Sequence, residues 1–62
     1  MTLADLTPAE RAVYEAARAE ALADRWRIDA ELSERHGMDA TVAREYQRDH
    51  EAEAADRWRW LA

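Results

Sequence analysis

The chain has 62 residues, and its 14 acidic and nine basic side chains give it a formal net charge of −5. This length allows one domain at most, the absence of cysteine excludes disulfides and thiolate zinc sites, and one glycine and one proline are too few for an all-β fold. Ala, Glu, Arg and Leu are frequent, which is typical of long helices, so we expect an all-α protein.

The first predicted element is a helix over residues 8–36. Thr7 has the spacing to cap the backbone amide of Glu10, whose carboxylate can reach back to the amide of Thr7. Pro8 falls at the first helical position, where its missing N–H has no cost. No residue breaks the helical pattern between Pro8 and Gly37.

A tight turn over residues 37–39 follows, and a second helix is predicted over residues 40–61. Gly37 suits the left-handed residue that ends a helix, and Asp39 suits the cap of the next one. Because the connection is short, the helices should pack antiparallel, with the numbers of opposite residues adding up to about 75. Residues 1–62 are therefore expected to form a single helical hairpin.

The first helix carries two apolar faces when residues are placed at 100° intervals. One face matches an apolar stripe on the second helix, and we predict that the two form the core of the hairpin: Tyr14, Ala17, Ala21, Ile28, Leu32, Val42, Ala43, Tyr46, His50, Ala54 and Leu61. The other face has heptad spacing and consists of Ala12, Ala16, Ala19, Ala23, Trp26 and Ala30. One hairpin covers only one face, so we expect the second face to bind another chain.

The alternative explanation of the second face is that alanine, the best helix former, simply fills exposed positions. An isolated exposed Trp26 would be unusual on a small soluble protein, which favours an interface. The simplest assembly is a homodimer of hairpins that forms a four-helix bundle, and docking on a larger protein is the other option.

Trp58 and Trp60 point to nearly opposite sides of a helix, so one of them is expected to contact a partner or cover the bundle end. The arm from Met1 to Leu6 is expected to fold over that end, with Leu3 and Leu6 near Trp60.

The tetrapeptide Asp-Arg-Trp-Arg occurs at residues 24–27 and again at 56–59. Arg beside Trp is typical of protein-binding hot spots and of surfaces that stack single-stranded nucleic acid, but it also fits an amphipathic helix with Trp inward and Arg outward. In length and layout, though in no motif, the predicted dimer resembles the Rop class of small hairpin dimers. RNA or DNA binding is therefore an alternative function, through Arg25, Arg27, Arg57 and Arg59. Nearby acidic residues and the net negative charge disfavour it.

No group of residues predicts catalysis, a metal site or a cofactor. His36 suits the end of the first helix, where a positive charge is favourable. His50 and Glu53 have the order His-x-x-Glu, the reverse of the Glu-x-x-His pairs of di-iron bundles. Glu31 and Glu34 fit ordinary ion pairs along a solvated helix face. A two-helix hairpin also lacks a pocket able to bury a substrate, so we expect no enzyme activity.

Together these patterns predict a non-enzymatic protein–protein interaction module, a self-associating hairpin that acts as a small accessory subunit or regulator of a larger complex. A third hypothesis is an acidic inhibitor, of the kind that some phages encode, which occupies the nucleic-acid groove of another protein. The interspersed Arg residues disfavour the continuous acidic surface that it requires.

No apolar run approaches the roughly 20 residues that span a bilayer, and the first residues lack a signal-peptide pattern, so we expect a cytoplasmic protein.

Overall fold

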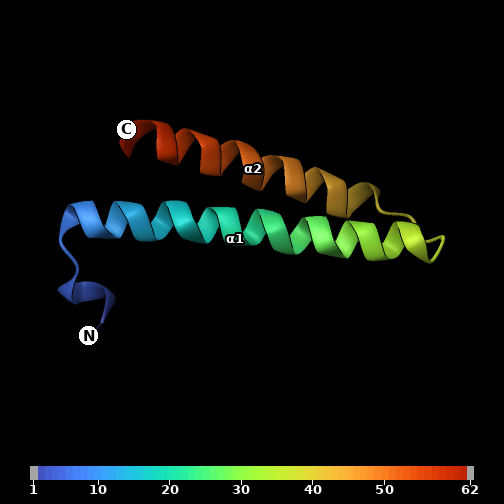
Figure 1. The fold of residues 1–62 in the computed structure, drawn as a ribbon, viewed down its shortest axis with the longest axis horizontal. Coiled ribbons are helices and arrows are strands. Elements are labelled where there is room, and N and C mark those ends of the chain that lie inside the picture. Colours follow the sequence, from blue (N-terminus) through green and yellow to red (C-terminus); the bar gives the residue numbers. More distant parts are fainter. Residues whose placement is uncertain (1, 62) are drawn as a thin grey trace.

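The computed structural model describes residues 2–61, which form two long helices joined by a short turn (Figure 1). Helix α1 spans Pro8–Arg35, helix α2 spans Thr41–Leu61, and a single 3-10 turn, η1, spans Leu3–Asp5. The ends of both long helices lie within one residue of the expected ones. The helices pack against each other, and residues 2–61 contain no strand, so the predicted all-helical hairpin is confirmed.

The start of α1 is fixed by the predicted reciprocal cap. The hydroxyl of Thr7 accepts a hydrogen bond from the amide of Glu10 at 3.1 Å, and the amide of Thr7 donates to Glu10 Oε1 at 2.9 Å. Pro8 occupies the first helical position, as expected. The bond from the Thr7 amide, assisted by the Thr7 hydroxyl, lowers the pKa of the Glu10 carboxyl below its ordinary value. This end of the helix is therefore stabilised most when Glu10 is ionised.

The turn combines a left-handed glycine with an acidic cap. Gly37 has a φ of 71°, and the amides of Gly37 and Met38 donate to carbonyls in the last turn of α1 at 3.1 and 2.7 Å. This pair of bonds is the Schellman motif that ends many helices. Asp39 then accepts from the hydroxyl and the amide of Thr41, at 2.6 and 2.9 Å, and these bonds lower the pKa of its carboxyl. Asp39 thus caps the first amide of α2, as the sequence indicated.

Contacts between the helices define an antiparallel register close to the expected one. In each contacting pair the residue numbers add up to 72 or 78, on either side of the expected 75. The pairs are Glu34 with Arg44, Glu20 with Trp58, Glu15 with Arg57, and Trp26 with Tyr46.

The described molecule is a single layer. It measures 45 × 25 × 13 Å, so its thickness is about half its width and less than a third of its length. Domains usually bury their apolar residues between two packed layers. Here both broad faces of the hairpin are open. Neither α1 nor α2 has a stretch apolar enough to cross a bilayer within residues 2–61.

The arm before α1 does not cover the open end of the hairpin. It leaves the start of α1 on the side away from α2 (Figure 1), where Arg11 donates to the carbonyl of Leu3 at 3.2 Å. The prediction that Leu3 and Leu6 lie near Trp60 is therefore wrong, and Met1 lies outside the described residues. A local cap holds the arm in its own turn instead, because the amide of Thr2 donates to Asp5 at 2.9 Å.

Candidate protein-binding surface

The contact between α1 and α2 is a seam of alanines. Every buried side chain of residues 2–61 is alanine: Ala16, Ala19, Ala23 and Ala30 of α1, Ala43 and Ala54 of α2, and Ala40 just before α2. Three of them, Ala30, Ala40 and Ala43, form a cluster against which Trp26 packs. Because the distance between packed helices depends on the side chains at the contact, alanine on both sides allows the helices to approach closely. We call these buried residues the alanine seam.

The alanine seam reverses the predicted roles of the two faces of α1. The face assigned to a second chain is covered by α2 at Ala16, Ala19, Ala23 and Ala30, while Ala12 and Trp26 are half-buried. The face assigned to the hairpin core is exposed at Tyr14, Ala17, Ala21, Ile28 and Leu32, and so are Val42, Tyr46 and Leu61 of α2. Of the predicted core, Ala43 and Ala54 are buried and His50 is half-buried. The close approach that matching small side chains allow therefore decides which face of α1 meets α2.

Large apolar side chains lie on the outside of the hairpin. Within residues 2–61 none of them is buried, and several are close to half exposed, including Tyr14 at 42%, Ile28 at 52% and Leu32 at 46%. These three residues, with Ala17 and Ala21, form a stripe that we call the outer stripe. At 100° per residue, its centre lies about 180° around α1 from the alanine seam. Helix α1 is therefore apolar on two opposite sides, and α2 covers one of them.

An aromatic pair borders the outer stripe. The rings of Trp26 and Tyr46 stack across the two helices, with their centroids 4.7 Å apart and an angle of 26° between their planes. Such pairs contribute about 0.5–1.5 kcal/mol beyond the area they bury. A hollow of about 310 Å³ beside Trp26 is lined by Ile28 and Leu32 together with Arg25 and Asp29. This hollow joins the aromatic pair to the outer stripe.

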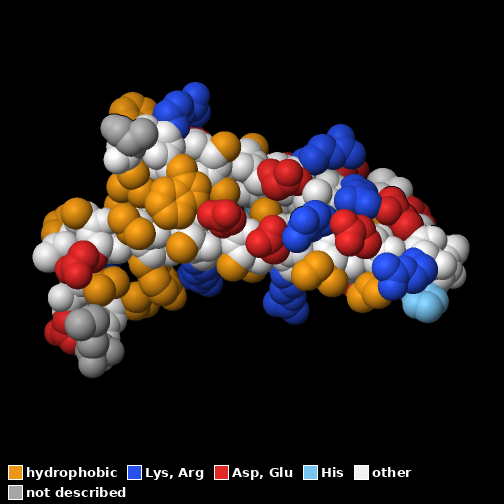
Figure 2. Space-filling view, viewed as in Figure 1, with side chains coloured by type: hydrophobic (Ala, Val, Ile, Leu, Met, Phe, Trp, Pro, Cys, Tyr) orange, Lys and Arg blue, Asp and Glu red, His pale blue; other side chains and the backbone are white. Residues whose placement is uncertain are grey.

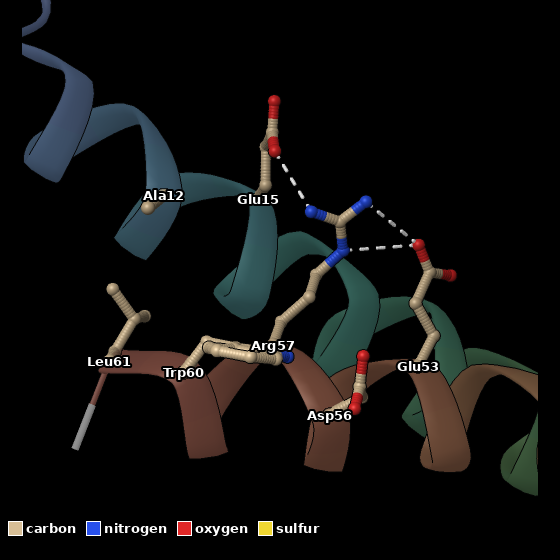
Figure 3. A pocket seen from close by; sticks show the side chains of 7 residues that line it. All are labelled: Ala12, Glu15, Glu53, Asp56, Arg57, Trp60 and Leu61. Carbon is tan, nitrogen blue, oxygen red and sulfur yellow. Dashed lines mark hydrogen bonds and ion pairs between the residues drawn. The ribbon is translucent and has the colours of Figure 1, made fainter.

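The open end of the hairpin contains a wider groove of about 450 Å³, shown in Figure 3. Apolar side chains of both helices line it, together with a bridge in which the Arg57 guanidinium lies between Glu15, at 2.9 Å, and Glu53, at 3.1 Å. The hydrogen bond to Glu53 is the main reason that the pKa of Arg57 is raised. Trp60 lines the groove and is 83% exposed. The bridge ties the two helices together beside this exposed indole.

The two tryptophans at the end of α2 have different surroundings. The indole N–H of Trp58 donates to Glu20 of α1 at 3.0 Å, and this side chain is 38% exposed, compared with 83% for Trp60. Trp58 therefore bridges the helices, while Trp60 lies largely in solvent. Binding of either indole to a partner stays a prediction.

The charged residues are neutralised locally. Three arginines of the Asp-Arg-Trp-Arg repeats form ion pairs: Arg27 with Asp24, Arg59 with Asp56, and Arg57 with Glu15 and Glu53. Near the turn, Arg44 holds Glu34 through two hydrogen bonds, which lower the pKa of the Glu34 carboxyl. In Figure 2, basic and acidic side chains alternate on the half of the visible face near the turn, whereas apolar side chains gather at the other half.

Nothing among residues 2–61 brings together the groups that metal binding requires. No cluster of three or more His, Asp or Glu side chains is close enough to hold an ion in this part of the chain. His50 lies at the helix contact, with its Nδ1 atom 3.7 Å from Glu53 and buried without a hydrogen-bond partner among the described residues. His36 occupies the C-cap of α1 and is exposed, as expected for a residue at a helix end.

Comparisons with protein-family models, curated proteins and solved structures found no match to this chain.

Proposed function

We propose that this chain is a non-enzymatic protein–protein interaction module, a self-associating helical hairpin that serves as a small accessory subunit or regulator of a larger complex. The observation that carries the proposal is the absence of any buried large apolar side chain within residues 2–61. A core of alanines contributes little hydrophobic stabilisation, because the free energy scales with the apolar area removed from water. A second chain on the exposed apolar side chains supplies the missing burial.

The exposed area supports the same proposal. The hairpin has an accessible surface of 4949 Å², whereas a compact folded protein of this mass has about 4,100 Å². The difference, about 800 Å², is close to what each partner contributes to an interface of standard size. A surface of that size is what the hairpin can bury when a second chain packs against it.

Sedimentation equilibrium across the micromolar range tests the proposal. The wild type is expected to associate, and Ile28→Glu is expected to shift it toward monomer because it places a charge in the outer stripe. Val42→Glu is the matched control, since Val42 is as apolar and even more exposed, at 60%, but lies on α2. A wild type that is folded and strictly monomeric throughout this range contradicts self-association.

Two functions of other classes have less support. RNA or DNA binding would use the arginines of the repeats, three of which already have acidic partners, and a gel shift at low salt tests it because phosphate contacts strengthen as salt falls. An acidic inhibitor of a nucleic-acid-binding protein would need a continuous acidic surface, whereas basic and acidic side chains alternate near the turn on the face that Figure 2 shows. Failure to bind any basic protein in a pull-down counts against the inhibitor.

A further inference from the structure

We infer that the outer stripe is the contact with a second copy of this chain, and that α1 of one copy packs antiparallel against α1 of the other. The inference rests on the proposed self-association and adds the face and the direction of the contact. In this arrangement α1 lies between two helices, with its own α2 against the alanine seam and the second copy's α1 against the outer stripe.

The sizes of the side chains in the outer stripe are complementary in an antiparallel arrangement. If the two-fold axis passes between positions 22 and 23, the numbers of facing residues add up to about 45. Ala17 then faces Ile28 of the second copy, and Tyr14 lies against Leu32 of the second copy. The large Ile28 thus packs beside the small Ala17, and Tyr14 and Leu32 make an apolar contact, which suits the close packing of facing helices. Tyr14, Ile28 and Leu32, the large side chains of the stripe, are 42–52% exposed in a single hairpin.

The charges at the two ends of the outer stripe also favour the antiparallel direction. At 100° per residue, Glu10 and Arg35 lie on the same side of α1 as the stripe, one at each end. In the antiparallel pair Glu10 lies close to Arg35 of the second copy, whereas a parallel pair brings Glu10 next to Glu10 and Arg35 next to Arg35. The macrodipoles of the two α1 helices are also opposed only in the antiparallel pair.

Disulfide trapping tests the face and the direction together. The chain contains no cysteine, so each single substitution introduces one thiol. Ala17→Cys and Ile28→Cys face each other across the antiparallel contact. Two copies of Ala17→Cys alone are offset by 11 residues there, about 16 Å along the helix axis at 1.5 Å per residue. A disulfide forms only when the Cα atoms come within about 7 Å. Val42→Cys is the control for random collision, since it is exposed and lies on the other helix.

An equimolar mixture of Ala17→Cys and Ile28→Cys chains is expected to oxidise mainly to the mixed disulfide dimer, identified by its mass, while each variant alone and Val42→Cys stay largely reduced. Efficient Ala17→Cys homodimers would overturn the inference in favour of a parallel pair. Absence of all disulfides while sedimentation shows a dimer would place the contact on another face and leave the proposed function standing. Absence of disulfides with a monomeric wild type would contradict both.

Discussion

Replacing Ala30 by leucine should damage the hairpin far more than the same replacement at an exposed alanine. Ala30 is fully buried, in the cluster with Ala40 and Ala43 and against the indole of Trp26. Leucine adds three carbon atoms at a point where two helices meet through alanine. Overpacking of this kind costs about 1–3 kcal/mol, and the helices must move apart to accept the new side chain.

That cost is large for this molecule. A core in a chain of this size rarely contributes more than about 3–5 kcal/mol in total, so Ala30→Leu removes a major part of the free energy of unfolding. Each kcal/mol corresponds to a fall of about 4–8 °C in the melting temperature of a small domain. The matched control is Ala52→Leu, because Ala52 is exposed on α2 and leucine is nearly as good a helix former as alanine. We expect Ala52→Leu to change stability by less than about 0.5 kcal/mol.

Urea unfolding followed by circular dichroism at one fixed protein concentration measures both variants. The expected result is a lower midpoint for Ala30→Leu and an unchanged one for Ala52→Leu. Equal midpoints for Ala30→Leu and the wild type would refute the assignment of the alanine seam to the contact between the helices. They would also restore the assignment of that face to a second chain.

Three further predictions concern the cap, the aromatic pair and pH. Thr7→Ala removes the hydroxyl that accepts from the free amide of Glu10 and should lower stability by about 1 kcal/mol in urea unfolding. Tyr46→Ala removes the stacked partner of an indole and should cost about 1–2 kcal/mol and weaken the near-ultraviolet dichroism. The pKa of Glu34 is lowered from 4.5 by its hydrogen bonds to Arg44, so its contribution to stability is complete above pH 4.5 and is lost as pH falls through the lowered value. A urea midpoint that does not fall on acidification from pH 6 to 3 would contradict this coupling.

The parts of the fold that depend on neighbouring residues could be predicted from the sequence. Thr7 and Glu10 are three residues apart and complete their bonds within one turn, and Gly37 needs only its own freedom to adopt a positive φ. These signals place both ends of α1 within one residue. They also set the length of the turn and hence the register.

The face by which α1 meets α2 could not be predicted in the same way. Both faces of α1 are apolar, so periodicity alone does not choose between them. The choice of Ile28 and Leu32 for the core followed the general rule that large apolar residues lie inside. The signal that could have corrected it is the alanine at Ala43 and Ala54 of α2, which matches the spacing of the alanines of α1 and permits close contact. The position of the arm before α1 could not be predicted either. The cap at Thr2 is its one local signal, and that cap fixes only the arm's own turn.

The position of the cluster at Ala30, Ala40 and Ala43, beside the turn, has a consequence for how the chain folds. Closing a short loop costs less entropy than closing a long one, so the contacts nearest the turn form first and those at the termini last. We therefore expect folding to proceed outward from the turn, and the residues around Trp60 to fray first when the protein is heated. The end that carries the most exposed indole is thus also the end that opens most readily.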